Sequence, residues 1–148
     1  MDRYINWQFL AKGGDATVFK AYDNIRNKWV AIKQYKYIPL TLLRETSLLK
    51  KINCKYIIRL LDVFNYNEFI YIVMKLSGQN ILEHIYNPIY ENIDKNKIMI
   101  QLIESINYLH SIGYIHGDIN FKNILYDNKN IKLIDFCSAV RTHRNVIY

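Results

Sequence analysis

Long apolar runs and paired cysteines are scarce in this sequence of 148 residues, and each scarcity excludes a class of protein. No apolar stretch approaches the roughly 18 residues that a membrane-spanning helix needs, and the N-terminus lacks the apolar segment of a secretory signal. The two cysteines, Cys54 and Cys137, make no disulfide framework and favour a reducing compartment. We therefore expect an intracellular protein of the cytoplasm or nucleus that does not span a membrane.

Clusters of basic residues are also missing, although the formal net charge is +7. Lysine and arginine are scattered, and no run of five or six basic residues occurs. A solvated basic surface is the simpler interpretation and polyanion binding the alternative, so no nucleic-acid partner is expected. With 51% hydrophobic and 22% charged residues, the composition is typical of a folded chain.

The chain has two halves with different hydrophobic patterns. Residues 4–75 contain short β-rich runs interrupted by one helical stretch, whereas the pattern becomes helical from about residue 80. The β-rich runs are Phe9–Leu10, Thr17–Tyr22, Trp29–Tyr35, Ile58–Phe64 and Phe69–Leu76. Lys75–Gln79 is the expected hinge between the halves. The sequence thus predicts an α+β fold.

The clearest helix of the second half begins near Asp94, a favourable N-cap, and ends before Gly113. Apolar residues at three- and four-residue spacing predict its buried face: Met99, Leu102, Ile103, Ile106 and Leu109. Two short strands, Ile124–Tyr126 and Ile131–Ile134, follow and are joined by a hairpin signal at residues 127–130.

Two features of the first half suggest phosphate chemistry. Small residues at positions 11, 13 and 16 would let backbone N–H groups approach a phosphate, although a hairpin with small residues is the commoner explanation. Lys33 closes an apolar strand, and Glu45 lies on the apolar face of a predicted helix, Leu42–Ile52. A buried carboxylate needs a partner because an unpaired buried charge is costly, and Lys33 is a suitable one. Such a Lys–Glu pair positions ATP phosphates in kinases.

The second half supplies polar residues in a matching order. His116-Gly117-Asp118 is followed by Asn123 and, after the hairpin, by Asp135-Phe136-Cys137. Phosphoryl transfer needs a carboxylate near the attacking hydroxyl and oxygen ligands for Mg²⁺. Asp118 suits the first role, and Asn123 and Asp135 suit the second. A loop of ordinary turn residues is the alternative, which the order of the motifs disfavours.

Taken together, these motifs resemble those of eukaryotic protein kinases, and among them the cyclin-dependent kinases and their relatives in the CMGC group. The similar segments are Ala16–Ala21, Val30–Lys33, Arg44–Lys50, Leu60–Phe64 and Pro39–Glu45, the last of which matches the PSTAIRE helix. The resemblance implies a single, partial kinase domain over residues 1–148. Its parts are a β-rich N-lobe with one αC-type helix (4–75), a hinge (75–79) and the first part of a mainly helical C-lobe (80–148).

The resemblance also implies roles for individual residues in an ATP- and Mg²⁺-dependent serine/threonine kinase. Met74 corresponds to the gatekeeper, and the backbones of Lys75 and Ser77 to adenine-binding groups. The other implied nucleotide-binding residues are Leu10, Gly13, Val18, Ala31, Lys33 and Leu125. The catalytic set is Asp118, Lys33, Glu45 and Lys122, and Asn123 and Asp135 are the metal ligands. The implied partners are a protein substrate and a cyclin-like activator in the cell cycle.

Several positions depart from the family pattern. Gly117 replaces an arginine that senses phosphate on the activation loop, and Cys137 replaces the glycine after Asp135-Phe136. Asn120 replaces a lysine that neutralises the γ-phosphate, so transition-state stabilisation should fall. We hypothesise that Lys122 supplies this missing charge. Only 12 residues separate Lys33 from Glu45, which shortens the surface that a cyclin would contact.

The end of the chain leads to two further expectations. Thr142-His143 and Tyr148 resemble parts of an activation segment, so we expect a kinase truncated after the motif at Asp135. Part of the apolar face of the helix at 94–113 would then be uncovered. Two alternatives stay open: a catalytically impaired pseudokinase or remnant that binds nucleotide or a partner, and a small-molecule kinase, because His-Gly-Asp also occurs in enzymes that phosphorylate antibiotics and choline.

Overall fold

The computed structural model describes residues 2–37, 40–86, 94–127 and 129–142. Their contacts form two compact units: unit 1 is Met1–Thr46 with Arg59–Leu76, and unit 2 is Ser47–Ile58 with Ser77–Tyr148. Each unit is described by itself. No helix of the described residues is both long and apolar enough to cross a membrane.

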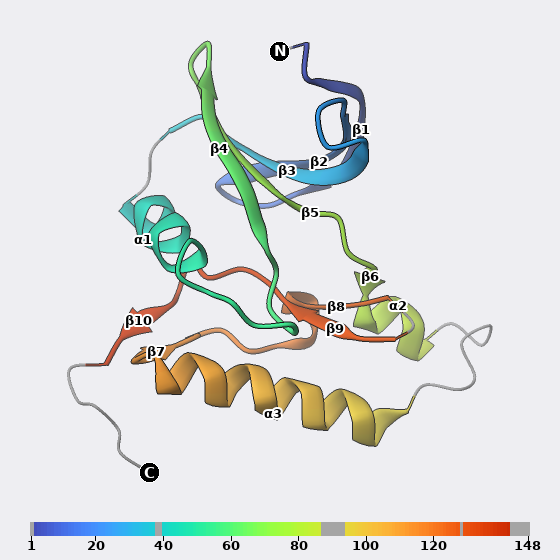
Figure 1. The fold of residues 1–148 in the computed structure, drawn as a ribbon, viewed down its shortest axis with the longest axis vertical. Coiled ribbons are helices and arrows are strands. Elements are labelled where there is room, and N and C mark those ends of the chain that lie inside the picture. Colours follow the sequence, from blue (N-terminus) through green and yellow to red (C-terminus); the bar gives the residue numbers. More distant parts are fainter. Residues whose placement is uncertain (1, 38–39, 87–93, 128, 143–148) are drawn as a thin grey trace. The chain divides into compact units, whose positions relative to one another are not determined.

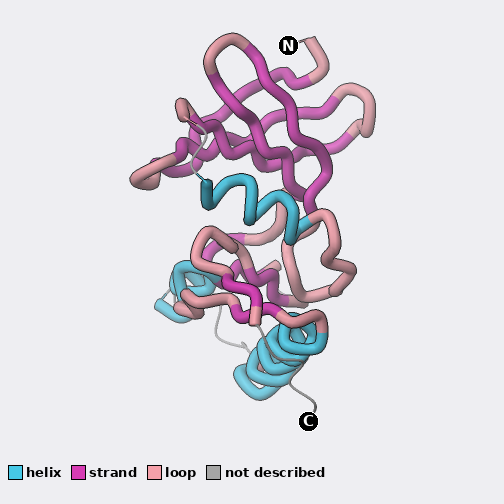
Figure 2. The backbone as a smooth tube through the Cα atoms, turned by 90° about the vertical axis from the view of Figure 1, so that its left-hand side faces the viewer, coloured by secondary structure: helices cyan, strands magenta, loops and turns pink. Residues whose placement is uncertain are grey.

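Unit 1 is a five-stranded antiparallel sheet with strand order β1-β2-β3-β5-β4 (Figure 1). Its strands are β1 (Tyr4–Lys12), β2 (Ala16–Asp23), β3 (Lys28–Tyr35), β4 (Leu60–Tyr66) and β5 (Phe69–Lys75). Figure 2 traces these strands in magenta, with helix α1 (Leu40–Leu49) following β3. All five predicted runs are strands. β1 extends beyond its predicted run. Its pairing with β2 shifts register twice, and these shifts disrupt the alternation that would have revealed the whole strand in the sequence.

The two faces of this sheet differ in character. Side chains alternate along a strand, so Val30 and Ile32 of β3 share a face with Tyr71 and Val73 of β5 and form the apolar core with them. Aromatic rings extend this core, because Phe64 stacks on Tyr71 with ring centroids 4.8 Å apart. The opposite face carries Lys33 among small and apolar side chains such as Ala31 and Met74, so the two faces differ in that one holds a cation.

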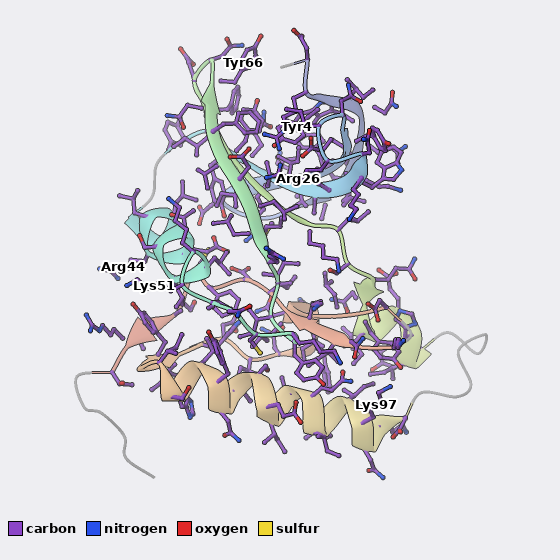
Figure 3. All side chains as sticks on the ribbon, in the orientation of Figure 1. Tyr4, Arg26, Arg44, Lys51, Tyr66 and Lys97 are labelled. Atoms are coloured by element: carbon purple, nitrogen blue, oxygen red, sulfur yellow. The ribbon has the colours of Figure 1, made fainter. Side chains whose placement is uncertain are left out.

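A buried carboxylate anchors the N-terminal segment to this sheet. The side chain of Asp23 is fully buried and forms ion pairs with Arg3 and Arg26, each at 2.8 Å. Arg3 also pairs with Asp62 of β4 at 2.6 Å. Figure 3 labels Tyr4 and Arg26 in this part of unit 1. The network joins β1, the β2–β3 turn and β4, which fixes the edges of the sheet.

Unit 2 combines helices with short strands. Its helices are α2 (Ile81–Tyr86), α3 (Lys95–Ser111) and the 3₁₀ turn η2 (Phe121–Asn123). Its strands form a three-stranded sheet, β6-β8-β9, and a pair, β10-β7. Their bounds are β6 (Gln79–Asn80), β7 (Tyr114–Ile115), β8 (Ile124–Tyr126), β9 (Ile131–Leu133) and β10 (Val140–Arg141). Helix α2 lies in the stretch that the sequence pattern predicts to be helical, whereas β6, β7 and β10 were missed because strands of two residues show no periodicity.

Residues 47–58 belong to unit 2, although the sequence boundaries placed them in the N-lobe. Two contacts explain this grouping: the N–H of Ile58 donates to the carbonyl of Leu133 at 3.0 Å, and the N–H of Asn53 donates to Tyr108 Oη at 2.8 Å. The chain passes finally into unit 2 between Leu76 and Ser77, within the range expected for a hinge.

Helix α3 has the predicted ends but only part of the predicted buried face, since Leu102 and Ile106 of that face are half-buried. Asp94 caps it by accepting a hydrogen bond from the N–H of Lys97 at 3.0 Å. Two residues of the predicted face are exposed, Met99 at 54% and Ile103 at 51%, whereas Leu109 is buried. The residues that the helix buries are Ile98, Gln101, Ser105 and Leu109.

Polar contacts explain the error in the predicted face. Gln101 accepts a hydrogen bond from the N–H of Ile131 at 2.9 Å and donates one to Asn130 Oδ1 at 3.2 Å. These bonds turn the side of α3 that carries Gln101 toward the β8–β9 hairpin. Hydrophobic periodicity takes no account of such bonds, so Met99 and Ile103 were wrongly assigned to the buried face.

Candidate active site

In unit 1, strand β3 and helix α1 bring together the lysine and glutamate singled out in the sequence. Lys33 Nζ lies 3.3 Å from Glu45 Oε1, and the Glu45 side chain is only 1% exposed. Tyr35 Oη also donates to Glu45 Oε2 at 3.3 Å. The predicted ion pair is therefore present, and a buried carboxylate holds the lysine ammonium in one place.

The register of the sheet places more of the predicted nucleotide-binding residues beside Lys33. Val18 is paired with Lys33 across β2 and β3, and Ala31 is paired with Met74 across β3 and β5. Because Ala31 and Lys33 are two residues apart, all four side chains share one face of the sheet. This face is lined by small and apolar side chains around one cation, which suits the base and the phosphates of a nucleotide.

The remaining predicted residues of unit 1 lie toward its edges. Leu10 is 47% exposed on β1, and Lys75 is exposed at the end of β5. Gly13 closes the β1–β2 turn by donating its N–H to the carbonyl of Ala16 at 2.8 Å. A side chain at Gly13 would meet nothing closer than that carbonyl at 3.6 Å, so the turn does not strictly require glycine there.

In unit 2, His116 ties the loop after β7 to the segment that follows β9. Its ring Nε2 lies 3.0 Å from the carbonyl of Ile134, and the ring packs against Phe136 with centroids 4.7 Å apart. The N–H of Ile134 in turn donates to the carbonyl of Asn123 at 2.9 Å. These contacts hold the loop that carries Asp118 and Asn123 against the residues immediately before Asp135.

Two asparagines hold the carboxylate of Asp118. Asn120 Nδ2 donates to Oδ1 at 2.8 Å, and Asn123 Nδ2 donates to Oδ2 at 2.9 Å. Asn123 Nδ2 also lies 2.9 Å from the Asp118 carbonyl, so one amide fixes both backbone and side chain. An ionised carboxylate has about four lone-pair sites, so each oxygen can still accept a further proton or hydrogen bond.

Asn120 has a second contact that sequence reasoning missed. Its Oδ1 accepts a hydrogen bond from the N–H of Lys122 at 2.9 Å and so caps η2. The sequence suggested only a lost positive charge at this position. The preference of asparagine for N-cap positions was the signal that could have revealed the bond.

The backbone is unusual at two positions of this loop system. Asp135 has a φ of 64°, in the left-handed region that residues other than glycine seldom occupy, and such strain is often concentrated at functional sites. Gly117 has a φ of 81°, and a Cβ there would lie 2.3 Å from the carbonyl oxygen of Ser138. The backbone therefore requires glycine at position 117. The sequence comparison had suggested only that an arginine that senses phosphate was lost there.

Unit 2 also contains the last predicted adenine-binding residues. Ser77 is 8% exposed, and its hydroxyl has no hydrogen-bond partner in the part of the chain that the structure describes. Leu125 is half-buried on β8, and Lys122 is exposed in η2. Thr142 lies just beyond β10, whereas His143 and Tyr148, compared above with an activation segment, and Pro39 of the PSTAIRE-like stretch lie outside the described residues.

The donor set of unit 2 fits a magnesium ion. Asn123 uses its amide nitrogen on Asp118, which leaves its amide oxygen as the atom for a metal. Asp135 adds a carboxylate, and Mg²⁺ is usually bound by one or two such side chains together with phosphate oxygens and water.

Comparison with known proteins gives one family. The protein kinase domain model matches residues 4–147. Among curated relatives, the chain is 32% identical over 145 residues to cell division control protein 2 homolog 2 of Trypanosoma brucei brucei, covering 91% of this chain and 42% of that protein. It is 34% identical over 142 residues to mitogen-activated protein kinase mpkC of Aspergillus terreus, covering 90% and 38%.

A third relative is the serine/threonine-protein kinase stk11 homolog of Dictyostelium discoideum, which is 36% identical over 148 residues, covering 90% of this chain and 25% of that protein. The chain thus spans less than half the length of each of these relatives.

Proposed function

We infer the activity from the family, because this chain belongs to the protein kinase domain family. We propose that it transfers the γ-phosphoryl group of ATP to a serine or threonine hydroxyl of a protein, with Mg²⁺ as cofactor. Within the family, similarity to a cell division control protein 2 homolog and to a mitogen-activated protein kinase supports a CMGC-type, cyclin-dependent-kinase-like enzyme.

One observation carries this proposal: the arrangement of Asp118, Asn123 and Asp135 in unit 2. Asn123 holds the Asp118 carboxylate through its side chain and the segment before Asp135 through its backbone. A proton acceptor and two oxygen donors are thereby linked within one small, hydrogen-bonded loop system. Phosphoryl transfer depends mainly on such positioning and on electrostatic stabilisation of charge.

Each of these residues has a definite role in the proposed reaction. Asp118 accepts the proton of the attacking hydroxyl while its carboxylate is oriented by the two asparagine amides. Lys33, oriented by Glu45, binds the α- and β-phosphates. Asn123 and Asp135 would hold Mg²⁺, which would neutralise phosphate charge when bound. The residues proposed to contact the nucleotide are, in unit 1, Leu10, Gly13, Val18, Ala31, Met74 and Lys75 and, in unit 2, Ser77 and Leu125.

Lys122 is the proposed source of the positive charge that Asn120 does not provide. It stands four residues after Asp118 and is exposed. The hydrogen bond from its backbone N–H to Asn120 Oδ1 keeps its backbone close to Asn120. Lys122→Ala should lower the rate of phosphoryl transfer at least about tenfold if its ammonium stabilises the transition state. Lys129→Ala, which removes an exposed lysine from the β8–β9 turn, is the control. An unchanged rate in Lys122→Ala contradicts this role.

The proposed partners follow from the same family membership. A protein substrate is required, and a cyclin-like activator in the cell cycle is proposed from the similarity to the cell division control protein 2 homolog. The proposed location is intracellular, in the cytoplasm or nucleus, and neither nucleic acid nor a membrane is a proposed partner.

The test is transfer of labelled γ-phosphate from Mg-ATP to a mixed protein substrate. Asp118→Asn should reduce transfer about 100-fold or more, the usual contribution of a general base. Glu104→Gln changes an exposed carboxylate on α3 to an amide and should leave the rate unchanged, which controls for the charge difference. Equal rates in wild type and Asp118→Asn would refute the assigned chemistry.

One observation favours a second candidate, a pseudokinase that binds nucleotide without turnover. Asn120 occupies the lysine position and uses its amide on Asp118, so this atom cannot neutralise a phosphate. A rise in melting temperature with Mg-ATP, together with no transfer to any acceptor, would support this candidate. Transfer to a small alcohol but not to protein would instead identify a small-molecule kinase.

A further inference from the structure

A hollow of about 440 Å³ opens in unit 1 beside the turn between β1 and β2. Its walls include residues 12–17 of that turn, Gln34 and Lys36 at the end of β3, and Phe69 at the start of β5. This volume lies within the range of about 300–1,000 Å³ that is typical of sites for small molecules. The hollow is therefore large enough for a ligand of its own.

The hollow lies on the face of the sheet that is opposite to Lys33. Gln34 directly follows Lys33 on β3, so the two side chains point to opposite faces. Gln34 is paired with Thr17 across β2 and β3, and its Nε2 donates to Tyr71 Oη at 2.9 Å. Tyr71 belongs to the apolar core. The sheet thus separates this hollow from the ion pair of Lys33 with Glu45.

The charge around the hollow favours an anion. Lys12 and Lys36 both line it and are exposed, and neither forms an ion pair with any residue that the structure describes. Asp15 is the one acidic residue among the described residues that line it. The ammonium of Lys36 lies 5.8 Å from the ring centroid of Tyr37, which keeps this charge at the rim. Two cations against one carboxylate leave a net positive charge at the hollow, which attracts an anion.

The remaining wall combines an aromatic ring with polar groups. Phe69 is half-buried, and its ring centroid lies 6.4 Å from that of Tyr71. Thr17 adds a hydroxyl to the same wall. A phosphate monoester carries up to two charges and several acceptor oxygens, which match two lysines and a hydroxyl better than a single carboxylate would. A flat apolar group on the ester would fit beside Phe69.

We propose that this hollow is a second ligand site, which binds a small phosphate monoester with a flat apolar group. Lys12, Lys36 and Thr17 bind the phosphate, and Phe69 contacts the apolar group. The site does not depend on the kinase activity proposed above, because Lys12, Lys36, Thr17 and Phe69 have no role in that activity. Of the described residues that line the hollow, Gly13 of the β1–β2 turn is the one that is also proposed to contact the nucleotide.

The experiment is titration of the full chain with phenyl phosphate, followed by backbone amide NMR and calorimetry. The amide signals of Thr17 and Gln34 should shift. Lys12→Gln and Lys36→Gln should each weaken binding by up to about fivefold, because an exposed ion pair contributes up to ~1 kcal/mol to the binding free energy. Lys28→Gln, which removes an exposed lysine at the other end of β3, should leave the affinity unchanged.

Further arms separate this site from the nucleotide site and define the ligand. Lys33→Met should leave phenyl phosphate binding unchanged, and a loss of binding there would mean that the probe occupies the nucleotide site, which overturns the proposal. Equal weakening by Lys28→Gln would show attraction to general surface charge and also overturn it. Inorganic phosphate should bind more weakly than phenyl phosphate, and equal affinities would refute the contact with Phe69. Absence of any amide shift refutes the site.

Discussion

The replacement of Asp23 is expected to destabilise unit 1 more than any surface change. This side chain has 0% exposure and accepts hydrogen bonds from two arginines and from the backbone N–H groups of Ile25 and Arg26. Asp23→Asn keeps the size of the side chain but places an amide donor or a neutral oxygen where two guanidinium groups donate. Removing one partner of a buried ion pair usually costs about 3–5 kcal/mol.

The lower end of that range is the better expectation here. Arg3 and Arg26 keep other acceptors, since Arg3 Nη1 lies 2.6 Å from Asp62 Oδ2 and Arg26 Nη2 lies 2.9 Å from the Leu61 carbonyl. Both arginine side chains are also partly exposed, so water can solvate them. We therefore expect the free energy of unfolding of unit 1 to fall by about 3 kcal/mol. In urea, with a slope of ~1.5 kcal/mol per molar, the midpoint should fall by about 2 M.

Tryptophan fluorescence measures this loss in the right part of the chain. The sequence has two tryptophans, and both Trp7 and Trp29 lie in unit 1. Asp62→Asn is the matched control, because Asp62 pairs with the same Arg3 but its side chain is 31% exposed. Its cost should stay within about 1 kcal/mol, as for other exposed ion pairs. A midpoint in Asp23→Asn no lower than that of Asp62→Asn would refute the reasoning.

Three further predictions concern the loop system of unit 2 and the N-terminal strand. Gly117→Ala should destabilise the protein by about 1–3 kcal/mol, because at its left-handed φ the new Cβ would overlap the Ser138 carbonyl. Gly14→Ala is the control and should cost less, because a Cβ there meets open space. Circular dichroism during thermal unfolding compares the two variants. Burial and the negative charge of Asp62 raise the pKa of Tyr4. The contribution of the protonated Tyr4 hydroxyl to stability is therefore present below about pH 10 and is lost as the pH rises further. Tyr4→Phe should flatten this alkaline decline in the stability measured by fluorescence. Asn120→Ala removes a hydrogen bond to an ionised carboxylate, and such a bond contributes about 1.5–3 kcal/mol. In phosphoryl-transfer assays, kcat should therefore fall about tenfold or more while KM for ATP is unchanged. An equal change in kcat and KM would contradict a role of Asn120 in positioning Asp118.

Helical and strand periodicity predicted the pair of Lys33 and Glu45 because both patterns are local. Alternation placed Lys33 at a defined face of β3, and the three- and four-residue spacing placed Glu45 on the apolar side of α1. The burial of a carboxylate then demanded a cation, which the structure supplies at 3.3 Å. The same reasoning did not reach Asn120, whose importance lies in two hydrogen bonds and not in its hydrophobicity or charge.

The exposed stripe of α3 shows why local pattern can choose the wrong face. The helix has apolar residues on more than one side, so periodicity alone cannot decide which side is buried. Hydrogen bonds between Gln101 and the β8–β9 hairpin select the side that carries Gln101, and Met99 and Ile103 are exposed.

The sequence by itself determined the order of the longer strands and helices and the buried acidic residue of α1, because these depend on spacing along the chain. The order of its motifs and their resemblance to a family also gave the set of residues expected to bind phosphate and metal. Only the tertiary structure decided that two amides hold Asp118, that Gly117 is required beside Ser138 and that a hollow lies on the face opposite to Lys33. Those features depend on individual side-chain hydrogen bonds, on backbone angles and on contacts between residues that are distant in sequence, and none of these leaves a periodic signal in the sequence.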